Sequence, residues 1–353
     1  MAEGVNKLQK LLDDPKITEI MINGSKATFI ETEGLSHPID VKFSEENIKE
    51  VIDGVFIKAG KQVSKNHPYA DLCMDDGSRL NIILHPLARF GTAITIRKFS
   101  KEIKSLEDLL DRGAMSQKMA DFLIACIKGK LNMLFSGATG TGKTTTLEML
   151  SYHIPDHERI VTIEDTAELQ LHQPNLVSLE TRDADPEDKG EVTLRDLIKN
   201  ALRMRPDRII LGEVRGEEAL DMIQAMSTGH KGTLAVVHGS SPKDILSRIE
   251  AMVLSSGIKL PLEEIRKMLI ATLDIVIQHE RFIDGSRRIT HISEIRGLER
   301  GEIALQDLFI FREEGKTSEG KLKGSFKTTM KMYPKFFASF QKQGLLDDKI
   351  FSD

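Results

Sequence analysis

The sequence is poor in the residues that single-stranded nucleic-acid binders use. Among 353 residues there is no tryptophan and there are only 3 tyrosines, so aromatic surfaces on which unpaired bases stack are scarce. The formal net charge is −5 and the pI is about 6.1, which disfavours a protein held on nucleic acid mainly by phosphate contacts. We therefore expect no nucleic-acid partner, although this overall balance does not exclude a local basic channel.

Cysteines and long apolar runs are also scarce. Cys73 and Cys126 are the 2 cysteines, too few for a disulfide framework or a four-cysteine zinc site, and reduced thiols of a cytosolic protein are the simple interpretation. Residues 1–16 contain no apolar signal core. The most apolar run, residues 268–277, is interrupted by Asp274 and is too short to span a bilayer. The sequence predicts a cytoplasmic protein.

The length favours two domains, and the pattern changes along the chain. Residues 1–100 mix short helices and strands, and predict a small α+β (PAS-like) domain. Residues 101–114 are charged and are interpreted as a linker with an entry helix. Residues 115–353 are interpreted as the second domain. To about residue 272 helix-length segments alternate with short apolar runs, which is typical of parallel βαβ units, and strands and hairpins follow. The predicted fold class is therefore α/β with a predominantly parallel sheet, preceded by the smaller domain.

Local signals define several elements. Residues 17–24 predict a strand that ends in the Asn23-Gly24 turn and pairs with residues 27–32. A helix is predicted from Ser44, as the N-cap, to a stop at Gly60. Four apolar runs predict parallel strands, and the Asp284-Gly285 pair predicts a later hairpin. The last 35 or so residues, with lysines every four positions from Lys323, favour a solvated polar tail. The four runs are residues 131–137, 159–165, 208–213 and 232–238.

The glycine-rich segment GATGTGKT, residues 137–144, fits the pattern G-x-x-x-x-G-K-[ST]. It follows an apolar strand and precedes a helix-like run, as a phosphate-binding P-loop requires. Glycines let successive N–H groups turn toward phosphate oxygens, and the helix N-terminus adds positive charge. The alternative is a glycine-rich turn that binds nothing. The predicted nucleotide-binding residues are Gly137, Ala138, Thr139, Gly140, Thr141, Gly142, Lys143, Thr144 and Thr145.

Within this motif, two side chains have expected roles toward ATP and Mg²⁺. Lys143 is expected to reach the β- and γ-phosphates. The Thr144 hydroxyl is expected to hold Mg²⁺. Binding alone is not hydrolysis, which also needs an oriented water and stabilisation of charge at the γ-phosphate.

Three later strand ends offer the missing groups. Glu164 and Asp165 end one apolar run, Glu213 ends the next, and His238 ends the one after that. Because ligands of open α/β sheets bind at the carboxyl ends of the strands, these side chains are expected to meet at the P-loop. A carboxylate there can orient or deprotonate water, or hold a hydrated metal. The alternatives are solvated acids at strand ends and a histidine that only packs or caps.

The segments RIVTIEDTAELQL (residues 159–171) and LRMRPDRIILGEVRGEEALDMIQAMSTGHKGTLAVVHGSSP (residues 202–242), with the P-loop, resemble the secretion ATPases of type II and type IV systems and type IV pili. The segment TLDIVIQHERFIDGSRRITHISEIRGLERGEIALQDLF (residues 272–309) is most similar to the tight-adherence (Tad) pilus ATPases, the CpaF-like proteins. In this chain Val236 replaces a threonine that is usual two residues before His238.

The resemblance implies a RecA-like ATPase domain hinged to the N-terminal domain, in a homo-hexameric ring. It implies Glu213 as the catalytic acid or base, Glu164 as a partner of metal through water, and His238 as a γ-phosphate sensor. Arg79 and Arg97 match positions that reach across to the γ-phosphate. Without the resemblance they are ordinary surface arginines of strands. Arg205 matches a position proposed to act on the nucleotide of a neighbouring subunit.

The expected function is a cytoplasmic ATPase, peripheral at the inner membrane, that drives Tad-type pilus assembly, pilus retraction or protein secretion through a membrane platform protein. Two other functions stay open. One is a RecA-like nucleic-acid translocase, against which the pI and the scarce aromatics speak. The other is a nucleotide-gated structural ring with little turnover.

Overall fold

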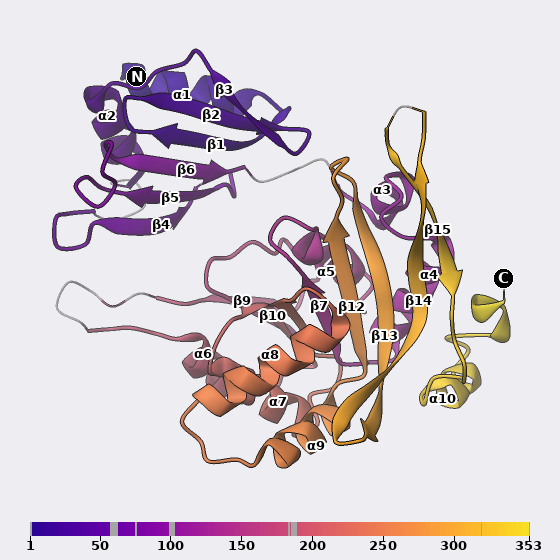
Figure 1. Cartoon of the computed structure of the whole chain (residues 1–353). Helices are drawn as coiled ribbons and strands as arrows, with labels where there is room; N and C mark the ends of the chain where they lie inside the picture. The colour runs from indigo at the N-terminus through magenta and orange to yellow at the C-terminus, as the bar shows by residue number, and fades with distance from the viewer. Residues whose placement is uncertain are drawn as a thin grey trace. The chain divides into compact units, whose positions relative to one another are not determined.

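The computed structural model describes residues 2–56, 63–74, 76–98, 103–182, 184, 189–318 and 320–352. The chain divides into two compact units, Met1–Glu102 and Ile103–Asp353. We call them the N-terminal unit and the P-loop unit, and each is described by itself (Figure 1).

The N-terminal unit is a six-stranded antiparallel sheet with two helices against it. The strand order is β3-β2-β1-β6-β5-β4. Alternate residues such as Ile20, Ile22, Leu80 and Ile82 are fully buried, so one face of the sheet packs under the helices in the period-2 pattern of strands. The elements are α1 (Glu3–Asp13), β1 (Ile17–Asn23), β2 (Ala27–Thr32), β3 (Leu35–Ile39), α2 (Glu45–Phe56), β4 (Tyr69–Cys73), β5 (Arg79–Ile83) and β6 (Ala93–Arg97).

The local signals in this unit are confirmed where the structure describes them. β1 and β2 pair antiparallel with Asn23 opposite Ala27, and Gly24 has the positive φ of 58° that the turn requires. The Ser44 hydroxyl accepts the N–H of Asn47 at the start of α2, as an N-cap does. The predicted helix stop at Gly60 lies outside the described residues.

The P-loop unit is built on a nine-stranded sheet in the order β15-β14-β13-β12-β7-β11-β10-β8-β9. The strands from β12 to β9 in this order are parallel, and β13, β14 and β15 extend the sheet antiparallel. The predicted α/β class is confirmed. Its strands are β7 (Met133–Gly137), β8 (Ile160–Glu164), β9 (Leu176–Glu180), β10 (Arg208–Val214), β11 (Leu234–His238), β12 (Ile275–Arg281), β13 (Arg287–Glu299), β14 (Glu302–Lys316) and β15 (Leu322–Thr328).

Helices cover both faces of this sheet. Alternation along β7 sends Met133 and Phe135 into one core and Leu134 into the other. The first core includes α3, α4, α5 and the C-terminal segment, and the second includes α6 to α9. Figure 1 shows α8 in front of the sheet and α9 at its lower end. The helices are α3 (Leu106–Asp111), α4 (Gln117–Lys128), α5 (Lys143–Ser151), α6 (Leu194–Ala201), α7 (Glu218–Ser227), α8 (Pro242–Ser255), α9 (Leu262–Thr272) and α10 (Phe337–Lys342), and η1 (Asp348–Phe351) is a 3₁₀ helix.

The entry helix expected within residues 101–114 forms as α3, but the assignment of the described part of this segment to a linker between domains was wrong. Residues 103–114 belong to the P-loop unit. α3 starts with a reciprocal capping box between Ser105 and Asp108, and Leu106 and Leu109 are buried in the first core. The charged residues that suggested a linker occupy the exposed face of a short amphipathic helix.

The prediction of a solvated C-terminal tail was also wrong. β15, α10 and η1 form there, and Phe337, Phe340 and Phe351 are buried in the first core. Lys335 is held to β13, because its Nζ donates to the carbonyl of Ile295 at 3.0 Å. Phe336, Phe337 and Phe340 have helical spacing, but this run is short and lies among lysines and polar residues, so the sequence pattern was too weak to predict burial.

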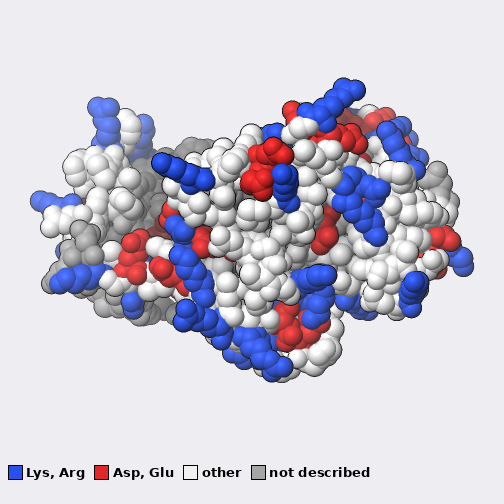
Figure 2. Space-filling view, turned by 90° about the horizontal axis from the view of Figure 1, so that it is seen from below, with Lys and Arg blue, Asp and Glu red and all other residues white. Residues whose placement is uncertain are grey.

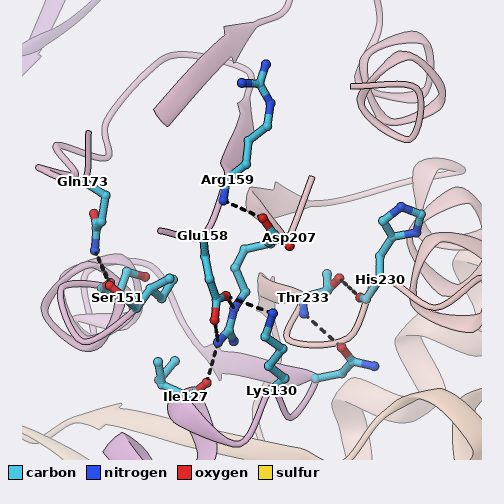
Figure 3. Close-up of polar contacts among 12 residues, drawn as sticks. Ile127, Lys130, Ser151, Glu158, Arg159, Gln173, Asp207, His230 and Thr233 are labelled. Carbon is cyan, nitrogen blue, oxygen red and sulfur yellow. Dashed lines mark hydrogen bonds and ion pairs between the residues drawn. The ribbon is translucent and has the colours of Figure 1, made fainter. Parts of the chain in front are cut away.

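The end of the sheet remote from the P-loop contains a buried ion pair. Arg208, at the start of β10, is fully buried. Its Nε donates to Glu158 at 2.6 Å and its Nη2 donates to the carbonyl of Ile127 at 2.8 Å. Lys130 lies 3.2 Å from the same carboxylate, and Figure 3 shows Glu158 between Ile127 and Lys130. A buried arginine with this carboxylate fixes where β10 begins.

Breaking this pair should destabilise the protein strongly. We expect Glu158→Gln to lower the free energy of unfolding by about 3–5 kcal/mol, because it leaves the buried guanidinium of Arg208 without its counter-charge. The matched control is Lys130→Gln, which removes a partly exposed partner and should cost under about 1 kcal/mol. Urea unfolding of both variants measures this. Equal losses would show that Arg208 does not depend on Glu158.

Candidate nucleotide-binding site

The P-loop connects the end of β7 to the start of α5. Gly137, Gly140 and Gly142 have φ values of 150°, 73° and 97°, a region that other residues rarely adopt. A Cβ built on Gly137 would lie 2.6 Å from the carbonyl oxygen of His279 and from Thr141 Oγ1. The motif therefore needs glycine here both for backbone conformation and for space.

The loop closes on its own lysine. Lys143 is buried, and its Nζ donates to the carbonyl of Ala138 at 2.7 Å. The Thr141 hydroxyl donates to the same oxygen at 2.9 Å. Gly142 is the N-cap of α5, so Thr144 and Thr145 lie in the first turn, where N–H groups and the helix dipole favour an anion.

Glu213 and His238 come together beside Lys143, as the sequence predicted. His238 Nε2 lies 2.8 Å from Glu213 Oε1, and His238 Nδ1 lies 3.5 Å from Lys143 Nζ. Arg215 Nη2 donates to Glu213 Oε2 at 2.6 Å. The parallel register brings this about, because His238 at the end of β11 pairs with Gly137 at the end of β7.

The surroundings of Glu213 and His238 set the charge of each side chain. Burial raises the pKa of Glu213, but the Arg215 hydrogen bond and the charges of His238, Arg215 and Lys143 outweigh it, so the pKa is lowered. Burial, followed by the charge of Lys143, lowers the pKa of His238 against the opposing effect of Glu213. At neutral pH the site therefore holds a carboxylate and a neutral imidazole. A neutral ring can accept from Lys143 Nζ at Nδ1, while Nε2 stays in close contact with Glu213 Oε1.

Glu164 lies one strand further along the sheet and is buried. Its Oε1 accepts the backbone N–H groups of Glu168 at 3.0 Å and Leu169 at 3.2 Å, so the carboxylate holds the following loop in place. A Cβ on Gly212 would lie 2.7 Å from Glu164 Cγ, which places Glu164 against the backbone just before Glu213. Asp165 is exposed. The role of Glu164 toward metal remains a prediction.

Arg205 is not at the P-loop of its own chain. It is exposed, has a φ of 53° and precedes β10, whereas Glu213 lies near the opposite end of that strand. The seven residues of β10 span roughly 20 Å.

Arg79 and Arg97 are direct cross-strand partners on β5 and β6 of the N-terminal unit. The roles of these three arginines remain predictions.

The sequence analysis missed the contribution of β12. His279 is buried, pairs with Gly137 and has its Nδ1 3.1 Å from the carbonyl oxygen of Ser136. Gln278 Nε2 donates to the carbonyl of Gly239 at 3.3 Å. The signal lay in the polar pair Gln278-His279 at the end of an otherwise apolar run.

A scan against protein families matches residues 1–285 to the family described as type II/IV secretion system protein. The chain belongs to this family. Among relatives, a Mycobacterium tuberculosis protein named for conjugal transfer is 31% identical over 84% of this chain and 86% of the relative. The type IV secretion system protein VirB11 of Brucella suis is 32% identical over 82% of this chain and 87% of the relative.

Two solved structures share the fold of this chain. The pilus retraction motor PilT with bound ADP matches with a TM-score of 0.57 and 19% identity, over 96% of this chain and 86% of PilT. The ATPase DotB of Legionella pneumophila matches with a TM-score of 0.56 and 17% identity, over 84% and 81%. These likenesses show that the chain shares its fold with these two proteins. In the described part of the chain, no helix is both long and apolar enough to cross a membrane.

The buried histidine beneath the P-loop predicts a pH dependence of stability. Burial lowers the pKa of His279 to about 4 from an ordinary value of 6.5, so folding favours the neutral ring. Its stabilising effect is complete above pH 6.5 and is lost as the pH falls toward 4, at up to about 1.4 kcal/mol per pH unit. Urea unfolding between pH 6.5 and 4.5 should show a shallower dependence in His279→Gln. The exposed control His157→Gln should keep the wild-type slope, and an unchanged slope in His279→Gln would contradict this assignment.

Proposed function

We propose that the protein is a motor ATPase that hydrolyses ATP with Mg²⁺ and works as a homo-hexamer. The observation that carries the proposal is the chain of contacts Lys143–His238–Glu213 at the mouth of a P-loop. These contacts link Lys143, which would bind the terminal phosphates, to Glu213, which would act on water. Membership of the type II/IV secretion family supports the same assignment.

Glu213 is the proposed base or water-orienting group. Its lowered pKa keeps it ionised near neutral pH. Arg215 donates a hydrogen bond to Oε2, and His238 lies 2.8 Å from Oε1. A carboxylate fixed in this way can align a water for in-line attack on the γ-phosphate. When a triphosphate takes over Lys143, the contact between Lys143 and His238 must loosen, so His238 is placed to respond to the γ-phosphate.

The residues fit a nucleotide-bound Mg²⁺ rather than a protein-held metal. Within the described residues no group of three or more His, Cys, Asp or Glu could hold a metal ion by itself. Mg²⁺ in phosphoryl-transfer sites takes one or two protein ligands and completes its shell with phosphates and water. The Thr144 hydroxyl and Glu164 through water would supply the protein part. Bound Mg²⁺ would neutralise charge on the phosphates.

Three arginines that do not lie at the P-loop of their own unit are consistent with the proposed hexameric ring. Arg205 lies at the opposite end of β10 from Glu213, so it would act on the nucleotide of a neighbouring subunit. Arg79 and Arg97 project from paired strands of the N-terminal unit. If both bind the γ-phosphate, ATP would draw the N-terminal unit onto the P-loop unit and phosphate loss would release it.

The cellular role we propose is the powering of Tad-type pilus assembly or retraction, or of protein secretion, in the bacterial envelope. The protein would be cytoplasmic and bind a platform protein at the inner membrane. The sequence similarity of residues 272–309 to the Tad ATPases and the names of the relatives support this role. A nucleic-acid translocase is less favoured, because the face in Figure 2 intersperses Lys and Arg with Asp and Glu.

Replacing the proposed base should separate turnover from binding. We expect Glu213→Gln to bind ATP with wild-type affinity and to lower kcat about 10²–10³-fold, since a positioned base contributes in this range. Phosphate release and calorimetric titration measure the two properties. Glu299→Gln, an exposed change on β13, is the matched control. Equal and negligible turnover in wild type and Glu213→Gln would favour a structural ring instead, and DNA-stimulated turnover would favour a translocase.

The arginines of the N-terminal unit should affect turnover without abolishing binding. We expect Arg97→Ala to retain ATP binding and to lose most phosphate release, because a guanidinium that meets the γ-phosphate stabilises charge that develops there. Arg89→Ala, a surface arginine of the same unit, should retain wild-type turnover. Wild-type turnover in Arg97→Ala would remove it from the mechanism.

A further inference from the structure

Two arginines that no part of the proposed mechanism uses lie beside the P-loop. Arg281 is the last residue of β12 and Arg287 is the first residue of β13. They are direct partners across this antiparallel pair, so they occupy the same face of the sheet. We call them the arginine pair.

The arginine pair faces the glycines that shape the loop. A Cβ built on Gly140 would lie 3.7 Å from Arg281 Nη1, and one built on Gly142 would lie 3.9 Å from Arg287 Cδ. Both side chains therefore lie close to the backbone expected to bind phosphate. Glycine at these two positions leaves room between the loop and the two side chains.

The hairpin that carries the pair is well anchored. β12 pairs with β7, with His279 next to Gly137. In the connecting turn, Asp284 accepts the Ser286 hydroxyl at 2.6 Å and the backbone N–H of Leu322, on β15, at 2.6 Å. These hydrogen bonds lower the pKa of Asp284 to about 2. The arginine pair is thus held by strands β12 and β13, and the turn between them is hydrogen-bonded to β15.

The placement of these charges favours an anion between the arginines and the loop. Lys143, in the same loop, adds a third cation, whose Nζ lies 3.5 Å from His238 Nδ1. Guanidinium groups form charge-assisted hydrogen bonds with phosphate oxygens. A polyanion bound at the loop would therefore lie near both guanidinium groups.

The sheet order shows which part of a nucleotide the pair would meet. β7 lies between β12 on one side and β11 on the other, with β10 beyond β11. His238 and Glu213 stand on the β11 and β10 side, so the arginine pair lies on the opposite flank of the loop. Groups there would hold a part of the nucleotide that is remote from the bond that breaks.

We propose that Arg281 and Arg287 bind the phosphate chain of a nucleoside diphosphate or triphosphate, at the phosphates that ADP and ATP share. This inference deepens the proposed function and depends on it, because the ligand is the same nucleotide. The pair serves binding and not hydrolysis. It differs in this from Arg97, whose expected effect is on turnover.

The test measures nucleotide affinity and turnover separately. In calorimetric titration we expect Arg281→Gln and Arg287→Gln each to raise the Kd of ADP and of ATP about tenfold, because each removes a charge-assisted contact. The double variant should show a Kd about a hundredfold higher and a shallower salt dependence of binding. At saturating ATP, kcat should stay within about twofold of wild type. A contact that binds substrate and transition state equally affects KM, and its loss does not slow an enzyme that is already saturated.

Arg312→Gln is the matched control, since it removes the same charge from an exposed site on β14 of the same unit. A Kd equal to that of this control would overturn the inference, and so would a fall in kcat with an unchanged Kd.

Lys143→Ala tests the proposed function independently. If it binds ADP as well as wild type does, the P-loop assignment fails together with this inference. If Lys143→Ala loses binding and the arginine variants keep it, only this inference fails. Thermal unfolding monitored by circular dichroism confirms that the variants are folded.

Discussion

The site depends on the backbone pairing of Gly137 with both neighbouring strands. His238 pairs with it on β11, and His279 pairs with it on β12. Only glycine fits at position 137, because the carbonyl of His279 and the Thr141 hydroxyl occupy the space where a Cβ would be. The turn that follows is therefore held from both sides before it reaches α5, and a change in either register would displace Lys143 relative to the residues that meet it.

The two histidines beside Gly137 have different environments and different consequences. His238 is partly exposed and lies between Lys143 and Glu213, so its contacts change with whatever Lys143 binds. His279 is fully enclosed, and burial keeps its ring neutral, so it supports the loop from below. One side of the P-loop thus carries groups suited to hydrolysis, and the other carries a rigid strand that ends in the arginine pair. Binding and chemistry can then be tuned by separate elements of the sheet.

Strong local signals were enough to predict much of the fold. Apolar runs bounded by glycine and charged residues predicted β7, β8, β10 and β11, because parallel strands buried on both faces must be apolar throughout. The failures occurred where burial depends on distant partners. α3 is charged on its outer face, β9 and β15 are only partly buried, and the C-terminal phenylalanines form a short run among polar residues. Each of these segments acquires its structure from a surface that the rest of the sheet provides.

The sequence by itself determined the conformation of the P-loop, because glycine spacing, lysine and threonine in that order act through local backbone geometry. It also placed Glu213, Glu164 and His238 at the right edge, since carboxyl ends of parallel strands share one edge. Only the tertiary structure decided which strand lies on each side of β7. Strand order depends on long-range packing that no local pattern encodes, so the buried His279, the Arg215 contact to Glu213 and the arginine pair became visible only in the folded sheet.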